Sequence, residues 1–282
     1  MPEISCNFTA SLVTYKAQIA DIMPVISGVL ESSCSKFYIV DNGQDQLLAT
    51  EIASLDSEKI QYIPAENRGF GAGHNIAIRH SIADGFPFHM IVNPDISFKT
   101  GSLEKIIAFM TQFPDIGLVM PKTLNSDGSL QHNCKFVPTP ADLIFKCFLP
   151  KALKQKRMKR FMMLEYDHST TLEVPYLCGC FMVFRNAVLE KTGLFDENFF
   201  LYPEDIDITR RIWHSGFRAV YFPGAEVTHA HAQASYKNWK MLWIHIQNMI
   251  RYFNKWGWIY DPLRDELNRK ILIANSDKKI LE

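Results

Sequence analysis

The chain has 282 residues, of which 47% are hydrophobic and 21% are charged, and its 30 basic and 30 acidic residues balance to a formal net charge of zero. This composition predicts a soluble α/β domain with an appendage, and the neutral balance gives no indication of nucleic-acid binding. Every apolar run is shorter than the roughly 20 residues that a membrane-spanning helix needs, and we expect no signal peptide because the N-terminus has no apolar region. Six cysteines without a framework spacing favour a reducing, cytoplasmic compartment.

The first hundred residues alternate apolar strands with helical stretches. Strands are expected at residues 7–16, 36–43, 59–64 and 88–95. Helices are expected between them at residues 20–33, 47–55 and 75–85. This order predicts a mostly parallel sheet with helices on both faces, in which ligands bind at the carboxyl ends of the strands. The polar residues at those ends are Thr14, Tyr15, Asp41, Asn42, Asn67, Arg68, Asn93 and Asp95.

The second half of the chain mixes strands and helices less regularly. We expect a strand and a hairpin at 115–133, a strand followed by a short helix at 172–193, a helix at 204–216 and strands at 218–235. The segment 178–180 reads Cys-Gly-Cys, but a zinc site would need further cysteines, so a core strand is expected there.

The segment from Lys146 to Arg160 contains seven basic residues and no acidic residue. Two interpretations stay open. The segment is either a solvated helix face or loop, or a patch that faces an anionic membrane or a phosphate-bearing substrate.

Residues 66–75 read ENRGFGAGHN, a glycine-rich loop between a predicted strand and a predicted helix. This context is typical of dinucleotide binding, and Asp95 follows at a plausible distance for a ribose contact. However, the third small residue of the dinucleotide pattern, counted from Gly69, falls on His74, which is too large for close packing of helix on strand. NAD binding is therefore kept only as an alternative to another nucleotide ligand.

Acidic residues stand at two places that suit catalysis. Asp95, in Asn93-Pro94-Asp95, ends a strand, where one carboxylate and the phosphates of a substrate can hold a hard divalent cation. Glu204 and Asp205 open a helix after an aromatic, apolar approach, so a partly desolvated carboxylate there can act as a general base. The alternatives are a turn at the first place and helix capping at the second.

Two further patterns lie near the end of the chain. His229, His231 and Gln233 share one face of a predicted strand, and they either contact a metal or phosphate or form structural hydrogen bonds. A helical stripe of large apolar residues follows, and it packs on its own domain, docks on a membrane surface or forms a dimer contact. Its members are Trp239, Leu242, Trp243, Ile246, Ile250 and Phe253.

Taken together, these motifs resemble the family 2, GT-A-fold glycosyltransferases over residues 8–235, and most specifically over 179–231. Within that family, NRGFG and NPD look most like bacterial rhamnosyltransferases of O-antigen and cell-wall assembly. The resemblance implies a Rossmann-like, mostly parallel mixed sheet flanked by helices, in a domain at 1–235 with a nucleotide-sugar half (1–100) and an acceptor half (101–235). A C-terminal helical extension would occupy 236–282.

The resemblance also implies roles for individual residues. Asp205 would be the catalytic base, and Glu204 would orient acceptor or donor. Asp95 would bridge Mg²⁺ or Mn²⁺ to the donor diphosphate, with His229 as an additional metal ligand. The residues at the nucleotide-sugar site would be Thr14, Tyr15, Asp41, Asn67, Arg68, Gly69, Asn93 and Asp95, with Asn93 in place of the first acid of the family's DxD element.

The function implied is inverting transfer of a sugar, with dTDP-rhamnose as the favoured donor, to a glycan acceptor that is lipid-linked. Such an enzyme would be cytoplasmic, with contact to the inner face of the membrane through 146–160 and 236–258 left open. The alternatives are a UDP-hexose-dependent transferase of the same fold, an NAD-dependent oxidoreductase, and a subunit that binds sugar nucleotides without turnover.

Overall fold

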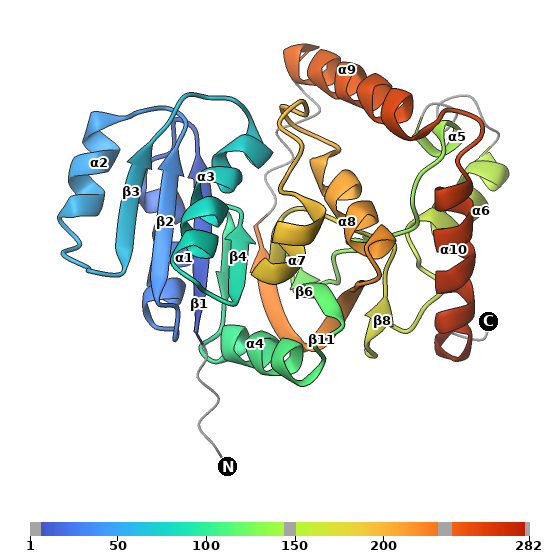
Figure 1. Cartoon of the computed structure of the whole chain (residues 1–282), viewed down its shortest axis with the longest axis horizontal. Helices are drawn as coiled ribbons and strands as arrows, with labels where there is room; N and C mark the ends of the chain where they lie inside the picture. The colour runs from blue at the N-terminus through green and yellow to red at the C-terminus, as the bar shows by residue number, and fades with distance from the viewer. Residues whose placement is uncertain (1–6, 144–150, 231–238, 280–282) are drawn as a thin grey trace.

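The computed structural model describes residues 7–143, 151–230 and 239–279. Among these residues, nine strands form one sheet in the order β3-β2-β1-β4-β10-β6-β11-β5, with β8 paired to β11, and helices flank this sheet (Figure 1). The strands are β1 (Phe8–Thr14), β2 (Lys36–Asp41), β3 (Ile60–Pro64), β4 (Phe88–Val92), β5 (Ile96–Phe98), β6 (Ile116–Leu124), β8 (Leu172–Glu173), β10 (Phe181–Arg185) and β11 (Arg218–His229). The prediction of a GT-A-like α/β fold is confirmed below by the solved structures that it resembles.

The strands β3, β2, β1 and β4 are parallel neighbours, as the alternating sequence pattern predicted. All five residues of β4 are buried, because helices cover both faces of this half of the sheet. The helices of this half are α1 (Ile19–Leu30), α2 (Gln46–Ala53) and α3 (Phe70–Ala83), whereas α4 (Ser102–Gln112) packs on β6 and β11.

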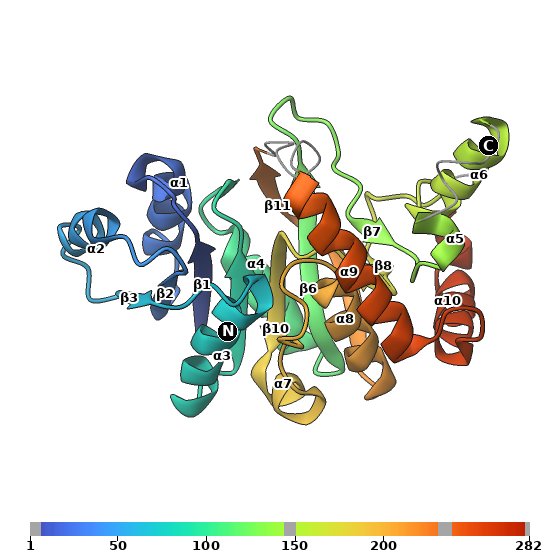
Figure 2. The same cartoon turned by 90° about the horizontal axis from the view of Figure 1, so that it is seen from above.

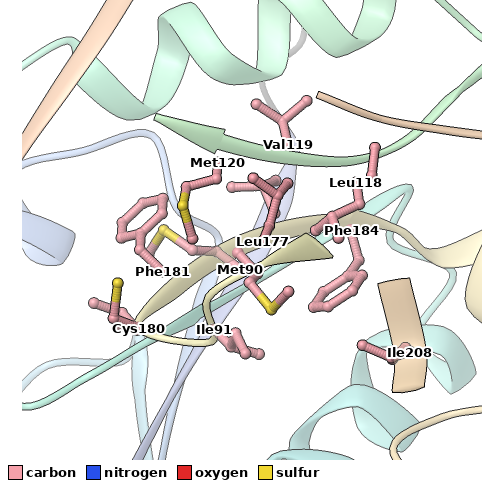
Figure 3. Packing of buried hydrophobic residues seen from close by; sticks show 14 of the residues in the cluster. Met90, Ile91, Leu118, Val119, Met120, Leu177, Cys180, Phe181, Phe184 and Ile208 are labelled. Carbon is pink, nitrogen blue, oxygen red and sulfur yellow. The ribbon is translucent and has the colours of Figure 1, made fainter. Parts of the chain in front are cut away.

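The other half of the sheet is mixed. Strand β10 inserts antiparallel between β4 and β6, and β11 runs parallel to β6 and antiparallel to β5 and β8. Helices α7 (Asn186–Thr192) and α8 (Glu204–His214) follow β10. Apolar side chains from β4, β6, β10 and α8 fill the centre of the molecule (Figure 3). The labelled members include Met90, Ile91, Leu118, Val119, Met120, Phe181, Phe184 and Ile208.

The glycine-rich loop differs from its predicted form, because α3 begins at Phe70 and includes the glycines at 71 and 73. A Cβ at Gly71 would lie 2.8 Å from the Cβ of Phe195, and one at Gly73 would lie 2.9 Å from the methyl groups of Val13. Gly69 has a φ of 103° and its Cα faces the backbone of Phe200. Each of these glycines therefore allows a close approach between segments of the chain itself.

The side chain of His74 in α3 was expected to be too large for close packing on the sheet, yet it is fully buried. The small residue opposite makes this possible, since Ser11 of β1 places its hydroxyl 2.8 Å from Nδ1 of His74. The same hydroxyl lies 2.8 Å from Nε2 of His89. A polar contact between layers thus replaces the small-residue contact of a dinucleotide fold.

One other segment differs from its prediction, and the basic segment is partly helical. The segment 178–180 is a turn between β9 (Tyr176–Leu177) and β10 rather than a core strand. Strand β9 pairs antiparallel with β7 (Cys134–Lys135) in a separate small sheet. Within the basic segment, residues 146–150 lie outside the described residues, and the rest belongs to helix α6 (Lys151–Phe161), near the short helix α5 (Pro140–Leu143).

The C-terminal part forms α9 (Trp239–Trp256), α10 (Pro262–Ala274) and a short 3₁₀ helix (Ser276–Lys278). Figures 1 and 2 show α9 crossing over the half of the sheet that carries α8, with α10 beside α6. The residues of the apolar stripe on α9 differ in their exposure. Phe253 is 2% exposed and belongs to the core, whereas Trp239 and Trp243 are 79% and 55% exposed. The predicted domain boundary at 235/236 lies outside the described residues.

The C-terminal helices are joined to α8 by buried ionic contacts. Nη2 of Arg210 lies 2.8 Å from Oδ1 of Asp261, and both side chains are almost completely buried. Asp207, in the first turn of α8, accepts a hydrogen bond of 2.8 Å from Nε1 of Trp256 and lies 2.7 Å from Nζ of Lys255. These contacts show that Asp207 holds α9 against α8.

Candidate active site

The first two residues of α8 are buried carboxylic acids, with Glu204 3% and Asp205 7% exposed. Asp205 is enclosed by donors, because its Oδ2 accepts hydrogen bonds from the backbone N–H of Gly179 at 3.0 Å and the hydroxyl of Tyr176 at 3.3 Å. Its Oδ1 accepts one from the N–H of Ile206 at 2.8 Å. Oε2 of Glu204, by contrast, has no hydrogen-bond partner among the described residues.

These surroundings affect the pKa values of the two acids differently. Burial, and next the charge of Asp205, raise the pKa of Glu204 to about 8. Burial also raises the pKa of Asp205, but the charge of Lys135, together with the donors from Gly179, Ile206 and Tyr176, acts in the opposite direction. Burial is the larger influence, so the pKa of Asp205 is still raised. Because the charge of Asp205 raises the pKa of Glu204, Asp205 is the acid of the pair that ionises first, and Glu204 keeps its proton to higher pH.

Glu204→Gln is expected to flatten the pH dependence of stability. In the unfolded chain the carboxyl ionises near its ordinary pKa of 4.5, but in the folded protein it stays neutral up to about pH 8. The folded state thus holds an extra proton between these values, and the wild type loses stability, on the order of a few kcal/mol, as pH rises through this window. Urea unfolding of the wild type and of Glu204→Gln at pH 5 and pH 8 measures how much stability each protein loses between these pH values. An equal loss of stability in the two proteins would contradict the raised pKa of Glu204.

A second pair of polar groups lies at the carboxyl end of β4. Oδ1 of Asp95 is 3.1 Å from Nε2 of His229, the last residue of β11. Nδ1 of His229 is 2.8 Å from Oε1 of Gln131, an oxygen that can only accept, so Nδ1 carries a proton and Nε2 is directed at the carboxylate. Within the described residues, no group of three or more His, Cys, Asp or Glu side chains gathers around one point. His231 and Gln233 lie outside these residues.

This pair fits a divalent cation. One carboxylate oxygen and one imidazole nitrogen of fixed tautomer are suitable ligands for Mg²⁺ or Mn²⁺ when substrate phosphates supply the rest. Asn93, which stands where the family's pattern has an acid, is partly exposed, and its backbone N–H donates to the carbonyl of Cys180 at 2.9 Å.

The turn at 178–180 links the two acidic places. Its Gly179 N–H binds Asp205, and its Cys180 carbonyl accepts from Asn93, two residues before Asp95. A Cβ at Gly179 would lie 3.3 Å from the Cβ of Asp205, so a larger residue there would press on the carboxylate. Sequence reasoning missed this role of the turn, as well as Tyr176, Lys135 and Gln131, although the glycine between two cysteines was a signal for a tight approach.

Asp41, predicted to hold the base and ribose of the donor, is fully buried and has four donors around it. Oδ1 accepts from the Thr14 hydroxyl at 3.0 Å and the Gly43 N–H at 2.8 Å, and Oδ2 accepts from the Asp45 N–H at 2.7 Å and the Tyr62 hydroxyl at 2.8 Å. Burial alone would raise the pKa of Asp41, but these hydrogen bonds outweigh it and lower the pKa. Both carboxylate oxygens are thus used within the protein, and Asp41 shapes the loop that follows β2.

The other residues predicted for the donor lie at the same edge of the sheet. Tyr15 follows β1 and is 56% exposed, which leaves its ring available for stacking on a base. Nδ2 of Asn42 lies 3.5 Å from Oδ1 of Asn67 and 3.4 Å from the carbonyl of Gly69, and Oδ1 of Asn42 has no partner among the described residues. Arg68 forms an ion pair of 3.1 Å with Glu197. A direct donor contact by these residues stays a prediction.

The profile of the family described as Glycosyltransferase like family 2 matches residues 20–254, which is most of the chain. The chain belongs to this family. A relative in Mycobacterium tuberculosis, N-acetylglucosaminyl-diphospho-decaprenol L-rhamnosyltransferase, is 26% identical over 155 residues, which are 52% of this chain and 48% of the relative. The rhamnosyltransferase WbbL of Escherichia coli is 26% identical over 225 residues, covering 76% of this chain and 80% of WbbL. The chain thus matches about half the length of the mycobacterial relative.

Solved structures confirm the fold of this family 2 chain. A crystal structure of GalNAc-T7 with UDP, GalNAc and Mn²⁺ has a TM-score of 0.64 at 12% identity, and the match covers 93% of this chain and 49% of GalNAc-T7. The predicted resemblance to family 2 and to rhamnosyltransferases is confirmed, and the NAD alternative is set aside. Within the described part of this family 2 chain, no helix is both long and apolar enough to cross a membrane.

Proposed function

We propose that the chain is an inverting glycosyltransferase that moves a sugar from a nucleoside-diphosphate donor to a hydroxyl of a glycan acceptor. The observation that carries the proposal is the turn at 178–180, which joins the buried Asp205 to the strand end that bears Asp95. Inverting transfer needs a base on the acceptor side and positive charge at the leaving diphosphate, and these two places are suited to the two tasks.

In this mechanism, Asp205 accepts the proton of the acceptor hydroxyl as that oxygen bonds to the anomeric carbon and the bond from this carbon to the diphosphate oxygen breaks. Asp205 is suited to this step because the charge of Lys135 and the donors of Gly179 and Tyr176 favour its ionised form, whereas Glu204 has no such donors at Oε2 among the described residues. Glu204, neutral at pH 7, can donate a hydrogen bond to acceptor or donor. Asp95 and His229 would hold Mg²⁺ or Mn²⁺, whose charge neutralises the leaving diphosphate.

We further propose dTDP-rhamnose as donor and a lipid-linked glycan as acceptor, in bacterial surface polysaccharide synthesis. Two relatives bear rhamnosyltransferase names, and one of these names includes a diphospho-decaprenol acceptor. The exposed tryptophans of α9 support contact with the inner membrane surface. Helix α9 itself contacts the segment that leads into α8, since Nδ2 of Asn248 donates to the carbonyl of Leu201, three residues before α8.

The test measures release of nucleoside diphosphate from a panel of dTDP-, UDP- and GDP-sugars, with a lipid extract as acceptor. We expect dTDP-rhamnose to be used and EDTA to stop the release. Asp95→Asn should lower the rate by about 100-fold or more, because the amide is a weaker ligand for a hard cation. The exposed Asp277→Asn is the matched control. Release that survives both EDTA and Asp95→Asn would remove the metal from the proposal, and no binding of any sugar nucleotide would overturn it.

The same assay tests the membrane contact. Trp243→Ser is expected to lower transfer to an acceptor held in vesicles and to leave transfer to a detergent-solubilised acceptor unchanged. Trp243 is 55% exposed, so the change leaves the core intact. Equal transfer to both acceptors by the variant and the wild type would show that α9 does not dock on the vesicle.

A further inference from the structure

A cavity of about 810 Å³ lies on the side of the molecule formed by α6, α10 and the segment 136–139. In Figures 1 and 2, α5, α6 and α10 stand together beside the part of the sheet that carries β8. None of Glu204, Asp205, Asp95 and His229 lines this cavity. Its volume is that of a site for a small organic ligand.

The wall of the cavity is apolar. Phe136 and Val137 are 6% and 1% exposed, and Tyr166 is 2% exposed, with its ring centroid 6.4 Å from that of Phe136. Leu272 of α10 completes the apolar lining. This surface suits a hydrocarbon chain or another apolar body.

The edge of the cavity is basic. Lys156 and Arg160 reach it from α6, and Arg269 reaches it from α10. All three are exposed, and none has a carboxylate within 4.0 Å among residues 7–143, 151–230 and 239–279. These cations are therefore available to an anion.

Three acidic residues also line the cavity, and two of them are already paired with arginines. Arg157 is neutralised by Asp142, whose Oδ1 lies 2.6 Å from its Nε. Asp265 is paired with Arg264 at 3.2 Å. Glu165 is exposed on the edge and is the carboxylate that an anion would have to avoid.

The hydroxyl of Tyr166 is a second, independent indication of a ligand. It is buried and has no hydrogen-bond partner among the described residues. A buried hydroxyl without a partner is unfavourable, and an acceptor oxygen of a bound molecule would satisfy it. The ammonium of Lys279 lies 5.7 Å from the centroid of the same ring, so a further cation stands beside the hydroxyl-bearing residue.

We propose that this cavity binds the phosphate or diphosphate group of a lipid, with the apolar chain against Phe136, Val137 and Leu272. The phosphate oxygens would contact Arg160, Arg269 and the hydroxyl of Tyr166. This inference goes beyond the proposed transfer and does not depend on it. The cavity is nevertheless connected to the carboxylates, because Phe136 follows Lys135, whose ammonium lies 5.4 Å from the ring centroid of Tyr176.

Three soluble probes test the proposal on the full chain. Farnesyl diphosphate carries both parts of the expected ligand, inorganic diphosphate carries only the anion, and farnesol carries only the apolar chain. Binding is measured by calorimetric titration of the Asp95→Ala variant in the presence of EDTA. These conditions suppress binding of diphosphate at the candidate metal pair, Asp95 and His229. We expect farnesyl diphosphate to bind at least about tenfold more tightly than either fragment, because both surfaces contribute.

The variants locate the site. Arg160→Gln and Arg269→Gln should each weaken binding of farnesyl diphosphate by about tenfold, and Lys105→Gln, an exposed cation of α4, should leave it unchanged. Tyr166→Phe should weaken it about threefold or more without lowering the melting temperature, since it removes only an unpartnered hydroxyl.

Three outcomes would overturn the proposal. They are the absence of binding, equal affinity for inorganic diphosphate and farnesyl diphosphate, and affinity that none of the three cavity variants changes. Failure of the proposed transferase function would appear separately, as absence of donor binding or turnover.

Discussion

Asp205→Asn is expected to lower the rate of sugar transfer by about 10² to 10⁴-fold, which is the contribution typical of a general base. The amide keeps the size of the side chain and can still accept a hydrogen bond from Gly179, but it cannot take the proton of the acceptor hydroxyl. Donor affinity should stay within about twofold of the wild type, because the expected donor contacts lie at the other strand ends. Steady-state rates and a direct donor titration on the same preparation measure both quantities.

Glu204→Gln is the contrast within the same carboxylate pair. Glu204 is already neutral at pH 7, because its pKa is raised to about 8, so the amide preserves its charge state. We expect this variant to retain most of the transfer rate that Asp205→Asn loses. If Asp205→Asn turned over normally while Glu204→Gln did not, the base would be Glu204. A chain that binds donor but shows no turnover even as wild type would be a sugar-nucleotide-binding subunit.

Asp261→Asn is expected to destabilise the protein by about 3 to 5 kcal/mol, because it leaves the charge of Arg210 buried without a counter-ion. Arg210 and Asp261 are about 2–3% exposed and 2.8 Å apart, and the guanidinium also lies 4.0 Å from the centre of the Trp256 ring. The amide still accepts the hydrogen bond from the N–H of Arg264 that caps α10, so the loss reports the ion pair rather than the cap. Urea unfolding at neutral pH measures the change.

An exposed ion pair of similar length provides the control. Lys36 and Asp84 are 2.7 Å apart, but their side chains are 44% and 39% exposed. Asp84→Asn should therefore lower the free energy of unfolding far less than Asp261→Asn does. Similar losses for Asp84→Asn and Asp261→Asn would contradict the importance of burial at Arg210.

The parts of the fold that could be predicted from sequence were those with a local signal. The four parallel strands were short stretches rich in apolar residues and followed by polar residues, and β4 with Asp95 was found in this way. Glu204 and Asp205 could be placed at a helix start from the Pro203-Glu204-Asp205 order and the apolar spacing that follows. Each of these signals lies within about 15 residues of sequence.

The parts that could not be predicted depend on contacts between distant segments. Gly179 and Asp205 are 26 residues apart, and Gln131 and His229 are 98 residues apart. No local pattern marks such a pair. The packing role of the glycines of α3 could not be predicted for the same reason, because their neighbours, Phe195 and Val13, belong to other elements. The carboxylate of Asp41 was placed correctly at a strand end, but its four protein donors could not be anticipated.

The buried contacts between α8 and the C-terminal helices have a consequence for synthesis on the ribosome. Arg210 is made well before Asp261, which neutralises it, and Asp207, which pairs with Arg211 inside α8, is made well before Lys255 and Trp256. During translation, Arg210 therefore has to wait for Asp261 before it can be buried as an ion pair. The helix that begins with Glu204 and Asp205 thus reaches its final packing only after Asp261 has been made, and a polypeptide that stopped before Asp261 would be exposed to proteases at that helix.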